Sequence, residues 1–134
     1  MKTRFCILVF IPLLYCVSCE RQTNNCLDLI QSSSIAGFPM DLYGVNDVEV
    51  IGEELHINVN YGGGCEEHEF GLINVITSIY GEDQQINVLH LTHNANNDVC
   101  YALILEHPLC YNISEILNGD SLYLSYQDSL YDLN

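Results

Sequence analysis

Apolar and polar residues alternate along several short stretches of the chain. From Leu55 to Tyr61 every second residue is apolar, which is typical of a strand with one buried face. Asp47 to Ile51 alternates in the same way, and the intervening Gly52-Glu53 favours a hairpin. Three glycines, Gly62 to Gly64, end the second strand. Because glycine tolerates positive φ and close backbone approach, they predict a tight corner just before Cys65.

Further strands are predicted downstream of this corner. His68 to Tyr80 and Ile86 to His93 carry apolar residues on both faces, so we expect them at the centre of a sheet. Val99 to Glu106 is the most apolar run, and we expect Pro108 to end it. Ser121 to Tyr126 is the last predicted strand.

The short strands and the turn signals between them predict an all-β fold. We expect one small antiparallel β-sandwich or partly open barrel, with a single helical turn from Ile113 to Leu117 and Asn112 as its N-cap. Leu27 to Ile30 is either a turn of helix or a first edge strand. No second domain or internal repeat is visible in the pattern.

Residues 1–18 have the features of a signal peptide that precedes this fold. Lys2 and Arg4 form a basic start, and Phe5 to Tyr15 form an apolar stretch. This stretch is shorter than the roughly 20 residues of a membrane-spanning helix. We therefore expect a cleaved leader, then a tether and N-terminal segment over residues 19–46, and a β domain over residues 47–134.

Cleavage after Ser18 would make Cys19 the first residue of the mature chain. Here the sequence resembles a bacterial lipoprotein signal, in which a small residue precedes a cysteine that is then acylated. Cys16 departs from that pattern, because leucine is usual at its position. The alternative is an ordinary secretory signal that is cut at the same bond.

The charge of the mature chain is strongly negative. The sequence holds 3 basic and 18 acidic residues, and Lys2 and Arg4 leave with the leader, so the net charge becomes 1 − 18 = −17. Such a surface repels phosphate backbones and anionic lipid head groups, which argues against nucleic-acid binding. No acidic loop has the ligand spacing of a calcium site.

The cysteines predict an oxidising compartment. Two of the seven lie in the leader and one is the lipidation candidate, which leaves Cys26, Cys65, Cys100 and Cys110. Four cysteines allow three pairings. We favour Cys65 with Cys100, which ties the glycine corner to a later strand. Cys26 would then pair with Cys110 and staple the N-terminal segment to the core.

The residues around the corner resemble those of a group of small uncharacterised lipoproteins from Bacteroides- and Flavobacterium-like bacteria. The resemblance covers residues 48–130 and rests on the spacing of one motif around Cys65 and a second around Cys100. The first motif holds Tyr61, Gly63, Gly64, Cys65, His68 and Phe70, and the second holds His93, Asp98 and Cys100. It implies a secreted β domain with a Cys65–Cys100 link and no established activity. Cys26 and Cys110 are not part of this pattern.

A zinc site is the alternative use of these residues, with His68, His90 and His93 as ligands and Asp98 as a further candidate. Residues three apart in a strand point to opposite faces, so His90 and His93 cannot both face one metal unless the strand ends between them, and the same argument applies to Cys65 and His68. Two cysteines in an oxidising compartment should also oxidise together. We therefore favour a disulfide flanked by histidines that hydrogen-bond loop backbone, and we predict no cofactor.

Catalysis is not favoured by the residue types present. His68 and Asp98 could exchange protons, but no G-x-S-x-G nucleophile motif and no H-E-x-x-H helix accompanies them. The sequence therefore predicts a non-enzymatic exported lipoprotein of the bacterial cell envelope. It would be anchored in the membrane by its N-terminal lipid, with a structural or ligand-binding role and no specified partner.

Overall fold

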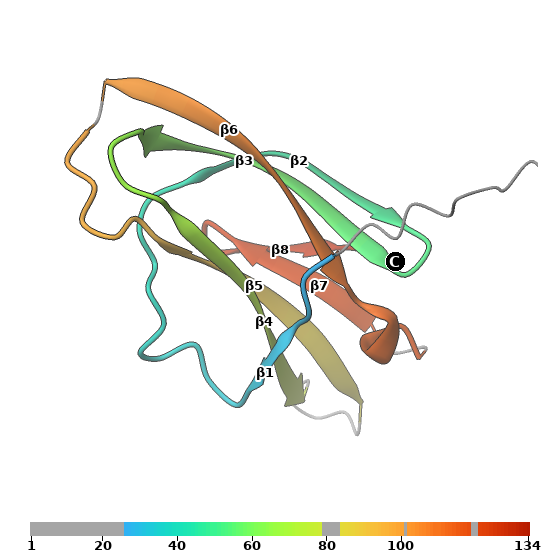
Figure 1. The fold of residues 1–134 in the computed structure, drawn as a ribbon. Helices are drawn as coiled ribbons and strands as arrows, with labels where there is room; N and C mark the ends of the chain where they lie inside the picture. Colours follow the sequence, from blue (N-terminus) through green and yellow to red (C-terminus); the bar gives the residue numbers. More distant parts are fainter. Residues whose placement is uncertain (1–25, 79–83, 101, 119–120) are drawn as a thin grey trace, which may run out of the picture.

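A computed structural model describes residues 26–78, 84–100, 102–118 and 121–134 of the chain. The predicted leader and Cys19 lie outside these ranges. Two sheets pack face to face as a sandwich that does not close into a barrel (Figure 1), which confirms the predicted fold class. The three-stranded sheet has the order β2 (Gly44–Ile51), β3 (Glu54–Gly63) and β6 (Leu103–Asn112). The five-stranded sheet has the order β1 (Ile30–Ser32), β4 (Glu69–Ser78), β5 (Gln85–Asn94), β7 (Ser121–Tyr126) and β8 (Ser129–Asp132).

The strand pairing is mixed, whereas the sequence predicted an antiparallel fold. β1 runs parallel to β4, and β5 runs parallel to β7. The other pairings, β2–β3, β3–β6, β4–β5 and β7–β8, are antiparallel. β1 is an edge strand, but it overlaps the predicted range Leu27 to Ile30 only at Ile30. Leu27 forms an isolated bridge to Tyr111, and no helical turn forms there.

The core lies between the sheets and follows the predicted period of two. Leu55, Ile57 and Val59 of β3 are buried, while the residues between them are partly exposed. The opposite sheet contributes buried leucines from its three central strands, namely Leu72, Leu89, Leu91, Leu122 and Leu124. The predicted hairpin between β2 and β3 is confirmed, and Gly52 in its turn has a φ of +63°.

β6 differs from the prediction at both of its ends. It begins at Leu103, not Val99, and it continues through Pro108 to Asn112. Proline is tolerated because β6 lies at the edge of its sheet. On the outer side of an edge strand no neighbouring strand accepts a hydrogen bond, so the N–H that proline lacks is not needed there. The expectation that Pro108 ends the strand was therefore wrong.

The chain before β1 covers the last part of this edge. The N–H of Leu27 donates to the carbonyl of Cys110 at 2.9 Å, and the N–H of Asn112 donates to the carbonyl of Leu27 at 2.9 Å. The N-terminal segment therefore pairs with β6 beside the Cys26–Cys110 bridge.

The predicted helical turn is a 3-10 turn, η1, over Ser114–Ile116. Its N-cap residue is Ile113, not Asn112. The side chain of Asn112 still contributes, because its Oδ1 accepts the N–H of Ser114 at 3.0 Å. Among the described residues, no helix is long and apolar enough to cross a membrane.

Candidate functional site

Hydrogen bonds and a disulfide converge on the corner after β3. We define the corner as residues 62–68 together with Asp98 and Cys100. Gly64 has a φ of +123°, a conformation that glycine favours, and the chain turns there toward β4 (Figure 1). A disulfide joins Cys65 to Cys100 with a Cα–Cα distance of 5.8 Å. The corner is thereby tied to the loop that follows β5.

Asp98 organises the corner through both of its carboxylate oxygens. Oδ2 accepts the backbone N–H groups of Gly64, Cys65 and Glu66 at 2.9, 3.0 and 3.1 Å. Oδ1 accepts the N–H of Cys100 at 2.7 Å. The N–H of Cys100, followed by those of the turn, holds the pKa of Asp98 well below its usual range, although burial acts in the opposite direction. The carboxylate therefore serves as the anion around which the turn folds.

Two histidines extend this network toward the start of β2. His68 Nε2 lies 3.2 Å from Asp98 Oδ2, and His68 Nδ1 lies 2.8 Å from His93 Nε2. His93 Nδ1 lies 3.2 Å from the carbonyl oxygen of Asp41. Every ring nitrogen of the two histidines is thus engaged. Burial lowers the pKa of His93, which is 1% exposed.

Aromatic rings enclose the two imidazoles. Tyr61 stacks on His68 with a centroid distance of 4.4 Å, and Phe70 stacks on His93 with the same centroid distance and a 6° interplanar angle. A surface cleft of about 470 Å³ lies beside them and is lined in part by Asp41, Leu42 and His93. Because the ring nitrogens are already paired, the imidazoles hold the corner together and offer the cleft no free base.

The structure brings three of the four candidate zinc ligands together. His68, His93 and Asp98 form the hydrogen-bonded chain described above, whereas His90 lies three residues before His93 in β5 and points to the opposite face. The premise that Cys65 and His68 lie in one strand does not hold, because the chain is irregular over residues 64–68 and β4 begins only at Glu69. His68 contacts a carboxylate and a ring, and only His93 hydrogen-bonds backbone as expected.

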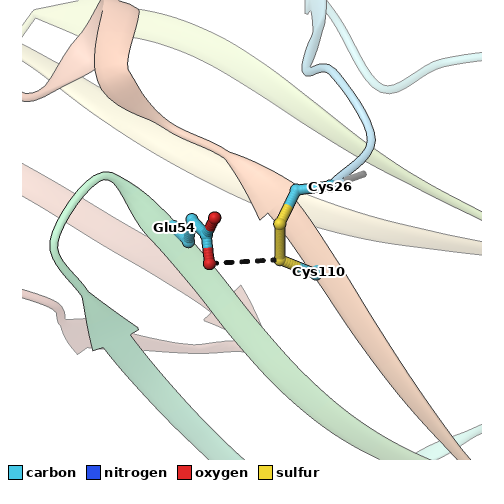
Figure 2. Close-up of side chains that lie close together, drawn as sticks. All are labelled: Cys26, Glu54 and Cys110. Atoms are coloured by element: carbon cyan, nitrogen blue, oxygen red, sulfur yellow. Dashed lines mark hydrogen bonds between the residues drawn. A yellow bond between two sulfur atoms is a disulfide. The ribbon is translucent and has the colours of Figure 1, made fainter. Parts of the chain in front are cut away.

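The second disulfide joins Cys26 to Cys110 on β6, with a Cα–Cα distance of 4.7 Å (Figure 2). The two bridges together are the pairing that the sequence favours among the three. Glu54 lies beside this bridge, and His56 lies beside Glu54. Neither was predicted as a site residue from the sequence, because only the pairing of β3 with β6 brings them near the bridge, with His56 opposite Cys110 and Glu54 opposite Asn112.

Sequence comparisons identify no relatives. No protein-family model matches the chain, and no curated protein matches it significantly.

Solved structures of similar fold come from Bacteroides and Parabacteroides species. A protein of unknown function, DUF1344, from Bacteroides vulgatus superposes with a TM-score of 0.59 at 8% identity, covering 81% of this chain and 55% of that one. A NigD-like immunity protein from Bacteroides caccae gives 0.55 at 15% identity, covering 79% and 58%. A putative toxin-related protein from Parabacteroides distasonis gives 0.55 at 18% identity, covering 81% and 59%.

These likenesses show a shared fold alone, because the sequence identities are low. The chain spans less than two thirds of the length of each of these three structures. The organisms agree with the bacterial group that the corner motifs resemble.

Proposed function

We propose that the protein is a non-enzymatic, exported binding protein, tethered to the bacterial cell envelope by a lipid on Cys19, and that its partner is a cationic protein. One observation carries the choice of partner. Of the 18 acidic residues, 4 lie outside the described ranges, so the described part holds 18 − 4 = 14 carboxylates. Lys2, Arg4 and Arg21 are the basic residues of the chain, and none of them lies in that part.

A surface of one sign favours a partner of the opposite sign. Summed charge raises the encounter rate with a complementary protein, and it suppresses binding to like-charged molecules. The descriptions of two structural neighbours, an immunity protein and a toxin-related protein, also favour a protein partner. The engaged ring nitrogens of the corner favour binding over catalysis.

Lipid attachment is tested by feeding radiolabelled palmitate to cells that express the full chain. We expect label on the wild-type protein and none on Cys19→Ser, with the unlabelled variant released from the membrane fraction. Equal label on both proteins, or no label on either, would contradict the tether.

The charge of the partner is tested by cross-linking in living cells followed by identification of the linked proteins. We expect basic proteins, whose capture falls as ionic strength rises, because screening weakens exposed charge pairs. Capture of acidic proteins, or capture that is unchanged by salt, would refute a cationic partner.

A further inference from the structure

Glu54 and His56 flank the Cys26–Cys110 bridge on the outer face of the three-stranded sheet. Leu55 and Ile57 alternate with them and point into the core, so Glu54 and His56 point outward together. The pairing of β3 with β6 places His56 directly opposite Cys110. The side chains of Glu54 and His56 are each 33% exposed, so solvent and small ions reach them.

The four potential ligand atoms lie close together. Glu54 Oε2 is 3.0 Å from His56 Nε2, and Cys110 Sγ is 3.9 Å from that oxygen and 3.8 Å from that nitrogen. Cys26 Sγ belongs to the same group, because it lies within 4.8 Å of both the Cys110 sulfur and the Glu54 oxygen (Figure 2).

We propose that reduction of the Cys26–Cys110 disulfide creates a zinc site made of Cys26, Cys110, His56 and Glu54. Two thiolates, an imidazole and a carboxylate are ligands that zinc accepts in a tetrahedral site. Zinc bond lengths of about 2.3 Å to sulfur and about 2.0 Å to nitrogen or oxygen give tetrahedron edges of about 3.5 Å from sulfur to either atom, and about 3.3 Å from nitrogen to oxygen.

The observed separations of 3.8, 3.9 and 3.0 Å are within about 0.4 Å of those edges. The remaining change is that the sulfur atoms of Cys26 and Cys110 must move apart once the bond between them is broken. No metal binds in the oxidised state, because a disulfide sulfur lacks the negative charge of a thiolate.

The chemistry balances with a dithiol as reductant. The dithiol supplies two electrons and two protons, becomes a disulfide itself, and leaves two thiols on the protein. Zinc then binds the thiolates and releases those two protons to water. Because Cys26 adjoins Leu27, which pairs with β6, the metal would hold the N-terminal segment on the sheet when the disulfide does not.

The other bridge provides an internal comparison. Asp98 lies beside the Cys65–Cys100 disulfide, but its two oxygens already accept four backbone N–H groups and contact His68. His68 in turn is engaged with His93. Zinc binding there would strip the turn of its anion, so we assign the site to Cys26–Cys110 alone. This inference does not depend on the proposed function.

The experiment titrates Co²⁺ and then Zn²⁺ into the purified mature chain, reduced under nitrogen with a water-soluble trialkylphosphine. The phosphine is oxidised to its oxide with oxygen from water, and unlike a dithiol it does not compete with the protein for the metal. We expect one metal per reduced chain, with cobalt–thiolate charge-transfer absorption that zinc abolishes, and none for the oxidised chain. His56→Ala and Glu54→Gln, which keep all cysteines, should each weaken binding by about tenfold or more.

Matched variants decide where the metal sits. Cys65→Ser/Cys100→Ser and His107→Ala, a histidine outside the group, should keep the site, whereas Cys26→Ser/Cys110→Ser should lose it. Absence of metal from the reduced wild type would overturn the inference, as would binding that survives His56→Ala. If the reduced chain were unfolded and bound metal through any of its cysteines, the two double-serine variants would lose the same affinity. That result would also overturn the inference.

Discussion

Gly63→Ala tests whether the corner tolerates a single added methyl group. Gly63 is buried and has no positive φ, so its backbone conformation suits alanine. A Cβ at this position would lie 2.7 Å from His68 Nε2 and 2.9 Å from Asp98 Oδ2. The substitution therefore isolates a packing conflict with the two side chains that organise the turn.

The size of the effect follows from how far His68 must move. An ordinary contact is about 3.5 Å, so the imidazole would have to retreat by about 0.8 Å. Tyr61 stacks on that ring at 4.4 Å, and a shift of this size would stretch the 3.2 Å contact with Asp98 beyond hydrogen-bond range. Overpacking typically costs about 1–3 kcal/mol, and an unpaired buried polar group adds about 1–3 kcal/mol. We expect Gly63→Ala to lower the free energy of unfolding by about 3 kcal/mol.

Gly44→Ala is the matched control. Its added Cβ would lie 2.5 Å from Asn60 Oδ1, which is an equally close contact on another strand pair. Asn60 is partly exposed, so its flexible amide can rotate away, and we expect a cost below about 1 kcal/mol.

Urea unfolding of the oxidised proteins, followed by far-ultraviolet circular dichroism, measures both values. In a double-mutant cycle, His68→Ala should relieve part of the cost of Gly63→Ala. If Gly63→Ala costs no more than Gly44→Ala, or if the cycle shows no coupling, the tight packing that we describe is refuted.

Three further predictions concern the bridge and the buried ionisable groups. Cys26→Ser/Cys110→Ser should lower the free energy of unfolding of the oxidised protein by about 4 kcal/mol in urea, because with the inner loop closed the outer loop spans 84 − 35 = 49 residues; an unchanged midpoint would contradict this. Stability should fall as the pH drops below about 6.5, by at most about 1.4 kcal/mol per pH unit per group, because burial lowers the pKa of His93 and the unfolded chain takes up the proton first. His93→Gln should make the free energy of unfolding depend less steeply on pH than in the wild type at equal urea concentration. An unchanged slope would refute the attribution of this pH dependence to His93. The ionised Asp98 stabilises the fold fully above its unfolded pKa of 3.8, and this contribution is lost as the pH falls through its lower folded pKa. The stability of Asp98→Asn should therefore depend less on pH in the acid range than that of the wild type, and identical acid unfolding curves for the two proteins would contradict this.

The interior strands were predictable because their signal is local. β3 alternates strictly, and β4 and β5 carry apolar residues on both faces, so their central place in the sandwich could be read from the sequence. The two ends of β6 could not be predicted in this way. Whether Pro108 ends a strand depends on which strand lies at the edge of a sheet, and that is decided by the order of strands far apart in the sequence.

The candidate site was predictable in its parts but not in its connections. Glycines, cysteines and histidines marked the corner, and the cysteine pairing followed the favoured choice among three. The role of Asp98 as acceptor for the turn depends on residues 30 to 34 positions away, and Glu54 meets Cys110 only across paired strands. Local patterns contain neither relationship, because both arise from long-range packing.

The most direct test of the account is the covalent state of the cysteines in mature protein that is purified without reductant. We predict an intact mass about four hydrogens lower than that of the reduced chain, since each bridge removes two. Peptide mapping should find Cys65 linked to Cys100 and Cys26 linked to Cys110. Free thiols at Cys65 and Cys100, or stoichiometric zinc bound at the corner, would contradict the account.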